Sequence, residues 1–183
     1  MIKRVFDLFI SFFGIILLMP IFIPVIFLVW FQDFHNPFYI AERVGKNKKV
    51  FNMIKIRSMT INADKTGVLS TSNDDQRITK VGKFIRKFKL DELSQLLNVF
   101  IGQMSFVGPR PNVKDEVDLY SDEELKLLNV KPGITDFASI VFSDEGSILE
   151  GSLNPDLDYN QLIRPGKGYL GLFYIKNQNL IMD

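Results

Sequence analysis

The feature that most restricts this chain is an apolar segment near its start. Leu8–Phe31, LFISFFGIILLMPIFIPVIFLVWF, is a run of 24 residues without one ionisable side chain. As a helix it would be about 36 Å long, enough to cross a hydrocarbon core of about 30 Å. A cleaved signal peptide fits less well, because its apolar region usually has about 7–15 residues followed by small ones. We therefore predict a membrane-bound segment.

Two prolines and the flanking charges bear on how this segment lies in the membrane. Pro20 and Pro24 each remove a backbone donor and clash with the preceding turn, so a sharp bend is expected there. Basic residues, which favour the cytoplasmic side, occur at both ends: Lys3, Arg4, Arg43, Lys46, Lys48 and Lys49. These residues are compatible both with a re-entrant hairpin and with a spanning helix. We adopt a re-entrant helix-break-helix for residues 1–34 and a single cytoplasmic catalytic domain for residues 35–183.

Cysteine and histidine usage narrows the available chemistry. The chain has no Cys and a single His, His35, which excludes disulfides, thiolate catalysis, Cys-ligated zinc and a histidine cluster. Catalysis must therefore use carboxylates, Lys, Arg, hydroxyls or a carboxylate-held ion. Residues 1–114 hold 17 Lys and Arg against 8 Asp and Glu, so an anionic membrane surface or an anionic substrate is expected. No nucleic-acid partner is expected.

Beyond the apolar segment, the pattern predicts a mixed, helix-rich α/β domain. Residues 38–60 resemble two strands around the turn GKNKK, and residues 63–77 are a polar loop. The next stretch, ITKVGKFIRKFKL, places apolar residues at helical spacing among basic ones: Val81, Phe84, Ile85 and Phe88. This pattern predicts an amphipathic helix lying on anionic headgroups, with a solvated basic face on a core helix as the alternative.

Two further helices are predicted in the middle of the chain. The first begins at Asp91 and closes at Gly102. Its apolar face would consist of Leu93, Leu96, Leu97 and Phe100. The second is VDLYSDEELKLLNV, residues 117–130, capped by Ser121 with Glu124 three residues later. Between the two helices, SFVGPRPN is predicted to be a rigid loop.

Asp91 and Glu92 stand side by side where the first of these helices is predicted to begin. Acidic residues favour a first helical turn, where the dipole stabilises them by about 0.3–1 kcal/mol, so an ordinary helix start is one interpretation. The same helix end favours ionised Asp91, and an ionised carboxylate can attack phosphorus or bind a divalent cation. Adjacent helical residues point about 100° apart, so the two side chains would divide these roles. Four basic residues could neutralise a phosphate here: Arg86, Lys87, Lys89 and Arg110.

With these residues in view, the chain resembles the bacterial sugar transferase family, the monotopic polyprenol-phosphate phosphoglycosyl transferases. The matching phrases follow one another through nearly the whole chain. They are KRVFD, the apolar segment with its prolines, RVGKNKKVFNMIKIRSM, DDQRIT, VGKFIRK, LDELSQLLNV, MSFVGPRP and KPGIT. This many phrases in one order make the resemblance specific.

The resemblance implies transfer of a sugar 1-phosphate from a UDP-sugar to undecaprenyl phosphate at the cytoplasmic face of the bacterial inner membrane. By this analogy Asp91 is the nucleophile, Glu92 helps to hold Mg²⁺, and UMP leaves behind a phosphosugar-aspartyl intermediate. Membrane lipids would be a further partner. The residues carried over as substrate-binding are Arg86, Arg110, Pro111, Lys55, Arg57 and Arg77. For Lys55, Arg57 and Arg77, an ordinary surface charge is the alternative.

Some positions depart from the family pattern. The family usually has Pro in place of Ser94 and an acidic residue in place of Gln103, changes expected to adjust packing more than chemistry. After KPGIT the chain has Asp136, and IVFSDEGSILEGS lacks the family's Asn-Gly-Arg segment, so no nucleotide contact is carried over to this region. Family members often continue beyond the position of Asp183, so a short member or a trimmed chain is expected.

Two rival functions fit the same residues. One is a non-catalytic membrane module that binds anionic lipid or a partner through the basic helix and Arg110. The other is a hydrolase that uses the two carboxylates on phosphoesters. Release of UMP from a UDP-sugar distinguishes all three functions.

Overall fold

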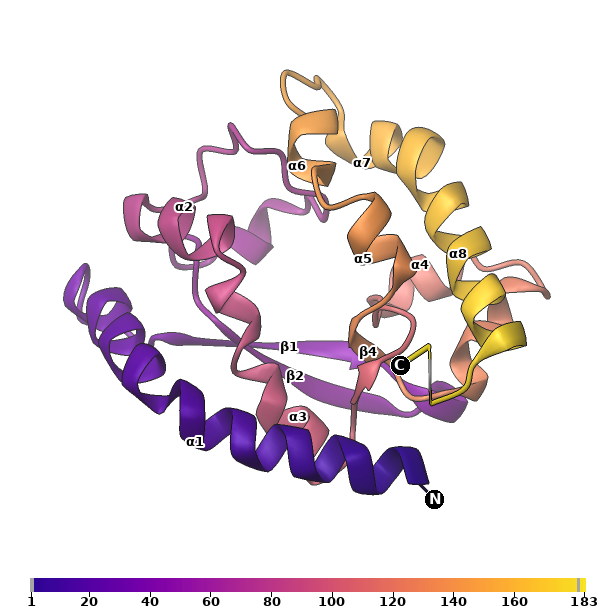
Figure 1. Cartoon of the computed structure of the whole chain (residues 1–183). Helices are drawn as coiled ribbons and strands as arrows, with labels where there is room; N and C mark the ends of the chain where they lie inside the picture. Colours follow the sequence, from indigo (N-terminus) through magenta and orange to yellow (C-terminus); the bar gives the residue numbers. More distant parts are fainter. Residues whose placement is uncertain (1, 181) are drawn as a thin grey trace.

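The computed structural model describes residues 2–180 and 182–183. A long helix, α1, lies along one side of two antiparallel strands, and the C-terminal helices gather on the other side (Figure 1). This is the mixed, helix-rich α/β architecture that the sequence predicts. The helices are α1 (Ile2–Phe31), α2 (Lys80–Lys87), α3 (Gln95–Ile101), α4 (Lys114–Val117), α5 (Phe137–Val141), α6 (Glu145–Ile148), α7 (Pro155–Asp158) and α8 (Arg164–Asn177). The strands are β1 (Phe38–Val44), β2 (Val50–Ile56), β3 (Ser105–Val107) and β4 (Gly133–Thr135).

Helix α1 contains the whole apolar segment. Pro20 and Pro24 lie inside it, so the helical structure is not interrupted where the helix-break-helix was expected. Each proline removes one backbone donor, and a helix can keep its remaining hydrogen bonds by bending. The ribbon of α1 changes direction toward its C-terminal part instead of breaking (Figure 1). Of the described helices, α1 alone is long and apolar enough to cross a membrane.

Both ends of α1 are fixed to the rest of the molecule. Near the start, Arg4 donates to the carbonyl oxygens of Val99 and Phe100 at 2.6 and 2.7 Å. One turn later, the buried carboxylate of Asp7 accepts the Ser105 hydroxyl at 2.9 Å and the backbone N–H of Phe106 at 3.0 Å. At the other end, a hydrophobic cluster consists of Val25, Val29, Ile56 and Ile85. The middle of the helix stays mainly exposed although its side chains are apolar.

Strands β1 and β2 form the predicted hairpin. They pair antiparallel with Val44 opposite Val50 and Phe38 opposite Ile56. Phe51 and Met53 point into a core shared with Val99 and Met104, as the alternation predicts. A second, parallel pair joins β3 to β4 and brings the loop after Val107 beside the KPGIT segment.

The segment from residue 80 to residue 102 differs from its prediction in one respect. Helix α2 forms as expected, with Thr79 as its cap, and leaves Phe84 and Phe88 exposed. The next α-helix, however, begins at Gln95, because Lys89 adopts a left-handed conformation (φ 55°) and Leu90–Glu92 is a short 3-10 turn. Gly102 ends α3 as predicted, with φ 91°.

The buried face of α3 also differs from its prediction. Leu97 and Phe100 are about two-fifths exposed, whereas the polar residues Ser94, Gln95 and Asn98 are buried. The apolar residues face the side of α1, where the ring centroids of Phe12 and Phe100 lie 6.3 Å apart. Ser94 and Asn98 face β2, to which they are hydrogen-bonded. Hydrophobic periodicity therefore predicted the burial of Leu96 correctly but missed the buried polar side chains.

The predicted helix over residues 117–130 is wrong as one element. The structure divides it into α4, which ends at Val117, and a 3-10 turn, Glu124–Asn129. The capping signal was correct: Ser121 Oγ accepts the Glu124 backbone N–H at 3.3 Å, and the Glu124 carboxylate accepts the Ser121 backbone N–H at 2.8 Å. The cap therefore starts a tight turn, which packs Leu128 in a cluster with Val44 and Val117.

Candidate active site

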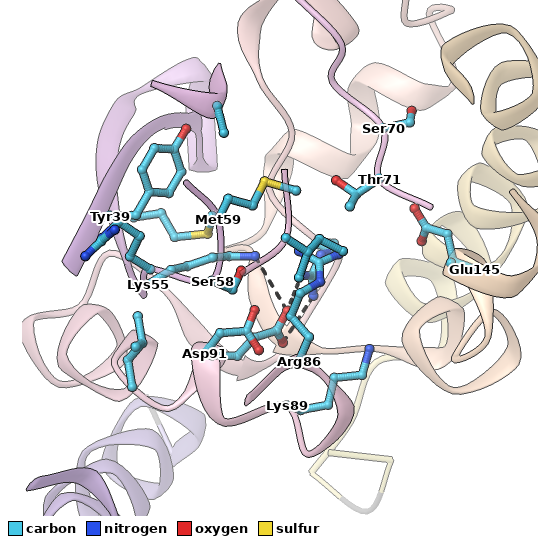
Figure 2. Close-up of a pocket in the computed structure, with 18 of the residues that line it drawn as sticks. Tyr39, Lys55, Ser58, Met59, Ser70, Thr71, Arg86, Lys89, Asp91 and Glu145 are labelled. Atoms are coloured by element: carbon cyan, nitrogen blue, oxygen red, sulfur yellow. Dashed lines mark hydrogen bonds and ion pairs between the residues drawn. The ribbon is translucent and has the colours of Figure 1, made fainter. Parts of the chain in front are cut away.

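A cavity of about 1340 Å³ lies between the β1–β2 hairpin, the α2–α3 connection and helix α6. Figure 2 shows Lys55, Arg86, Lys89 and Asp91 on one side of it, and Ser70, Thr71 and Glu145 across from them. The first group comes from β2, from α2 and from the α2–α3 connection. The structure thus brings the predicted carboxylates together with several of the predicted cations.

Asp91 lies in the 3-10 turn before α3 and is 7% exposed. Its Oδ1 atom is buried and has no hydrogen-bond partner in the described part of the chain. Buried carboxylate oxygens are normally paired, because an unpaired one costs about 1–3 kcal/mol. A buried, unpaired oxygen beside a large cavity is therefore a group available to a ligand.

Burial decides the protonation tendency of Asp91. It raises the pKa of the carboxyl above its ordinary value, against the opposing positive charge of Lys55, while the neighbouring Glu92 adds to the increase. The expectation that the helix end would favour the ionised form is therefore wrong. The short 3-10 turn has only a small dipole, and the burial of the carboxyl away from solvent has the larger effect on the pKa of Asp91. A raised pKa keeps the carboxylate basic, which favours nucleophilic attack once the group is ionised.

Glu92 is held by two cations. Arg110 donates to both of its carboxylate oxygens, with Nη1 3.4 Å from Oε2, and Lys55 Nζ lies 3.6 Å from Oε1. Burial alone would raise the pKa of Glu92, but Arg110 and Lys55 outweigh it and lower the pKa to about 2. The pKa values of the two neighbouring carboxyls are thus shifted in opposite directions, that of Glu92 downward and that of Asp91 upward. They differ in the way that a division of roles requires.

The same arrangement also shifts the pKa values of Lys55 and Arg110. Burial, helped by the charge of Arg110, lowers the pKa of Lys55 to about 8, even though Glu92 and Asp91 favour its ammonium form. The pKa of Arg110 is raised by Glu92 despite the burial of the guanidinium. Pro111, the next residue, is buried in the cavity wall. Arg86 faces the same cavity, and its charge acts on Asp91.

Arg57 and Arg77 lie in a different setting. Arg57 forms a two-pronged ion pair with Asp33, at 2.5 and 2.7 Å, and donates to the carbonyl of Asn36 at 2.9 Å. Arg77 pairs with Asp75 at 2.7 Å and donates to several loop oxygens, including the Val68 carbonyl at 2.8 Å. Both border the cavity, yet their guanidinium groups organise the chain after α1 and the loop at residues 63–77.

No pattern in the sequence predicted one wall of the cavity. Glu145 at the start of α6 forms an ion pair with Lys167 from α8, and Arg43 and Glu116 line the same side. Glu145 belongs to the segment that departs from the family pattern. These charges are far apart in the chain and follow no spacing rule, so only the closure of the fold brings them together.

The carboxylates of the site are candidate ligands for a magnesium ion. Among the described residues, no three His, Asp or Glu side chains gather as a protein-only metal site. Mg²⁺ usually takes one or two carboxylates and obtains its other ligands from water and phosphate oxygens. Asp91 and Glu92 offer such a pair, and the unpaired Oδ1 of Asp91 is a free donor. The residues therefore fit Mg²⁺ held jointly with a phosphate substrate.

Comparisons with known proteins agree with this chemistry. The family model described as "Bacterial sugar transferase" matches residues 1–183. The "Exopolysaccharide production protein ExoY" of Sinorhizobium fredii is 39% identical over 148 residues, 73% of this chain and 66% of that protein. The "Undecaprenyl-phosphate galactose phosphotransferase" of Salmonella typhimurium is 34% identical over all of this chain and 38% of its own length.

A third relative names a donor. The "UDP-N-acetylgalactosamine-undecaprenyl-phosphate N-acetylgalactosaminephosphotransferase" of Aeromonas hydrophila is 31% identical over 186 residues. The match covers 100% of this chain and 41% of that protein. The chain thus spans less than two thirds of the length of these curated relatives, and the similarity concerns the part that contains Asp91, Glu92 and Arg110.

Proposed function

Because this chain belongs to the bacterial sugar transferase family, we propose that it transfers a sugar 1-phosphate from a UDP-sugar to undecaprenyl phosphate and releases UMP. The names of the relatives from Salmonella typhimurium and Aeromonas hydrophila support the acceptor, and the latter supports the donor class. Such a reaction would be the first membrane step in building a surface glycan.

The observation that carries this proposal is the environment of Asp91. Its carboxylate is buried, unpaired at Oδ1 and bordered by the cations Lys55, Arg86 and Arg110 within one cavity. A phosphate brought to this position would be neutralised by those cations while the carboxylate attacks it. Charge stabilisation of this kind is commonly the largest contribution to phosphoryl-transfer rates.

In the first step, a carboxylate oxygen of Asp91 would attack the sugar-linked phosphorus of the donor. The bond from that phosphorus to the bridging oxygen breaks, and UMP leaves with the electron pair. This forms an acyl phosphate between Asp91 and the sugar phosphate. In the second step, a phosphate oxygen of undecaprenyl phosphate attacks the same phosphorus, and the Asp91 carboxylate departs.

The other site residues would support these steps without forming covalent bonds. Glu92 would hold Mg²⁺, which supplies positive charge to the diphosphate when bound. Lys55, Arg86 and Arg110 would bind phosphate oxygens, and Pro111 would keep the Arg110 loop rigid. Arg57 and Arg77 would act indirectly, because their ion pairs with Asp33 and Asp75 hold the chain after α1 and the loop at residues 63–77.

The membrane arrangement belongs to the same proposal. We propose that α1 enters the membrane from the cytoplasmic face of the bacterial inner membrane and returns to that face. Its middle is exposed and apolar, with Leu17 78% exposed, and Phe84 and Phe88 at the end of α2 are exposed as well. Residues 35–183 would then lie at the headgroups, where the phosphate of the lipid acceptor is found.

The decisive experiment is a screen of UDP-sugars with undecaprenyl phosphate and Mg²⁺, scored by UMP release and by formation of lipid-linked sugar. The proposed enzyme releases UMP and forms the lipid product. A hydrolase would also free sugar phosphate without the lipid acceptor. A binding module would release no nucleotide with any donor, and that result would overturn the proposed function.

A further inference from the structure

The outer edge of strand β2 is covered by two side chains of α3. In an antiparallel pair, successive residues direct their backbone groups to opposite sides, so Asn52 and Ile54 direct theirs away from β1. Asn98 Oδ1 accepts the Ile54 N–H at 3.0 Å, and Asn98 Nδ2 donates to the Asn52 carbonyl at 2.8 Å. Ser94 Oγ donates to the Ile54 carbonyl at 3.0 Å. Two side chains four residues apart thus replace a neighbouring strand.

These contacts are buried and therefore specific. Ser94 is 1% exposed and Asn98 is 0% exposed. Gln103 Oε1 accepts a further hydrogen bond from Asn98 Nδ2 at 2.7 Å, which fixes the orientation of the amide. A buried polar group without its partner costs about 1–3 kcal/mol, so any shift of β2 along α3 is opposed by several unpaired groups at once. Apolar packing alone would tolerate such a shift more easily.

Lys55 is the residue that this arrangement places. It follows Ile54 and shares a strand face with Phe51 and Met53, both of which are buried in the core. A one-residue slip of β2 would move Lys55 to the opposite face. Its ammonium group reaches Glu92, which lies two residues before Ser94 in the same turn region. The elements that carry Lys55 and the Asp91–Glu92 pair are therefore joined at Ser94 and Asn98.

We propose that Ser94 and Asn98 are positioning residues, whose hydrogen bonds to β2 hold the Lys55 ammonium against Asp91 and Glu92. The placement follows from the hydrogen bonds themselves, while its effect on turnover rests on the proposed function. Ser94 is one of the positions at which the chain departs from the usual family residue, and proline there would have no hydroxyl to donate. Gln103, another of these positions, belongs to the same network.

The first test needs no catalysis. Full-length protein in lipid nanodiscs is treated with an amine-acylating reagent, and modification of Lys55 is followed by peptide mass spectrometry. Ser94→Ala should increase the acylation rate of Lys55 several-fold while leaving that of Lys87 unchanged. Ser11→Ala is the matched control, because Ser11 is equally buried and bonds only to carbonyls within α1. An unchanged Lys55 rate in folded Ser94→Ala would overturn the proposal.

The second test is a double-mutant cycle on turnover. Ser94→Ala and Lys55→Met should each lower kcat, by roughly tenfold or more, because small displacements of catalytic groups are costly. The double variant should be no slower than Lys55→Met, since Ser94 acts through Lys55. Losses that simply multiply would show a general structural role and overturn the proposal. Asn98→Ser repeats both tests from the other residue if Ser94→Ala folds poorly.

The two tests also separate this inference from the proposed function. If no UDP-sugar yields UMP with the wild-type protein, the proposed function fails, and the acylation of Lys55 still decides whether Ser94 and Asn98 position it. If UMP is released but the Ser94 variant leaves both the acylation and kcat unchanged, the proposed function stands and the positioning role fails.

Discussion

Arg110 donates hydrogen bonds to both carboxylate oxygens of Glu92, although the two residues belong to different loops of the chain. Pairing of this two-pronged kind fixes direction as well as distance. It places one guanidinium between the segment that contains Asp91 and the rigid loop that follows β3. A phosphate that enters the cavity meets a cation whose position is already set.

Removing Arg110 should therefore impair the reaction more than the fold. Arg110→Ala is expected to lower kcat by on the order of 10²-fold, because charge stabilisation in the transition state is lost. Arg110→Lys should recover part of the rate, since it keeps the charge and loses the two-pronged geometry. Steady-state UMP release with saturating donor measures both. A rate near wild type for Arg110→Ala would remove Arg110 from the site.

Asp91→Asn should abolish the covalent step. Wild-type protein incubated with donor and Mg²⁺ but without lipid should release about one UMP per active site and gain the mass of a sugar phosphate. The variant should do neither, because a neutral amide is not a nucleophile toward phosphorus. Intact-protein mass spectrometry and a nucleotide assay make the measurement. Turnover by the variant would mean that another residue attacks the donor.

The same substitution should make the folded state more stable. Burial raises the pKa of Asp91, so the charged carboxylate is less favourable in the folded state than in the unfolded chain. Asp91→Asn should therefore increase the free energy of unfolding by roughly 1–3 kcal/mol at pH 8. The destabilisation caused by charged Asp91 grows as the pH rises from the pKa of Asp91 in the unfolded chain through its raised pKa in the folded state. The stability gained by Asp91→Asn should therefore be smaller at pH 3 than at pH 8. Urea unfolding at both pH values tests the sign.

Asp7→Ala should destabilise the protein, because it leaves the Ser105 hydroxyl and the Phe106 N–H buried without their acceptor. A loss of about 1–3 kcal/mol in the free energy of unfolding is expected. Asp7→Asn keeps an acceptor oxygen in the same place and serves as the control. Chemical unfolding in detergent micelles measures the difference. Equal stability of Asp7→Ala and Asp7→Asn would contradict the role assigned to the carboxylate oxygens.

The membrane arrangement of α1 can be examined with introduced thiols, because the chain has no cysteine. Ile2→Cys and Lys48→Cys place one thiol on each side of the apolar segment, and Ile2 is 71% exposed. A re-entrant helix leaves both thiols inside the cell, so an impermeant reagent should label them only after permeabilisation. Labelling of Ile2→Cys in intact cells would show that the helix spans the membrane.

Local rules predicted the elements that short stretches control. The hairpin at residues 38–56, the end of α3 at Gly102 and the Ser121–Glu124 cap depend on neighbouring residues, and the structure confirms them. The α-helical start at Asp91 was wrong because Lys89 adopts a left-handed conformation that no propensity rule singles out. The prediction of one helix over residues 117–130 also failed, because α4 ends at Val117 and only a 3-10 turn, Glu124–Asn129, follows.

Properties of the site depended on tertiary structure. The sequence identified the Asp91–Glu92 pair, but the tendency of Asp91 to ionise was assigned from the helix dipole, and burial raises the pKa of Asp91 instead. The buried polar face of α3 could not be read from hydrophobic periodicity, because Ser94 and Asn98 are buried to satisfy a strand edge that lies 40 and 44 residues earlier. The wall formed by Glu145 and Lys167 exists only after α6 and α8 come together.

The fixed start of α1 has a consequence for the order in which the protein is made. Arg4 and Asp7 are synthesised before their partners at Val99, Phe100, Ser105 and Phe106, which follow 95 to 99 positions later. A nascent chain must therefore carry this helix with two charged side chains unsatisfied until the third strand has emerged. Helix α1 thus obtains its full set of contacts only after strand β3 has been made.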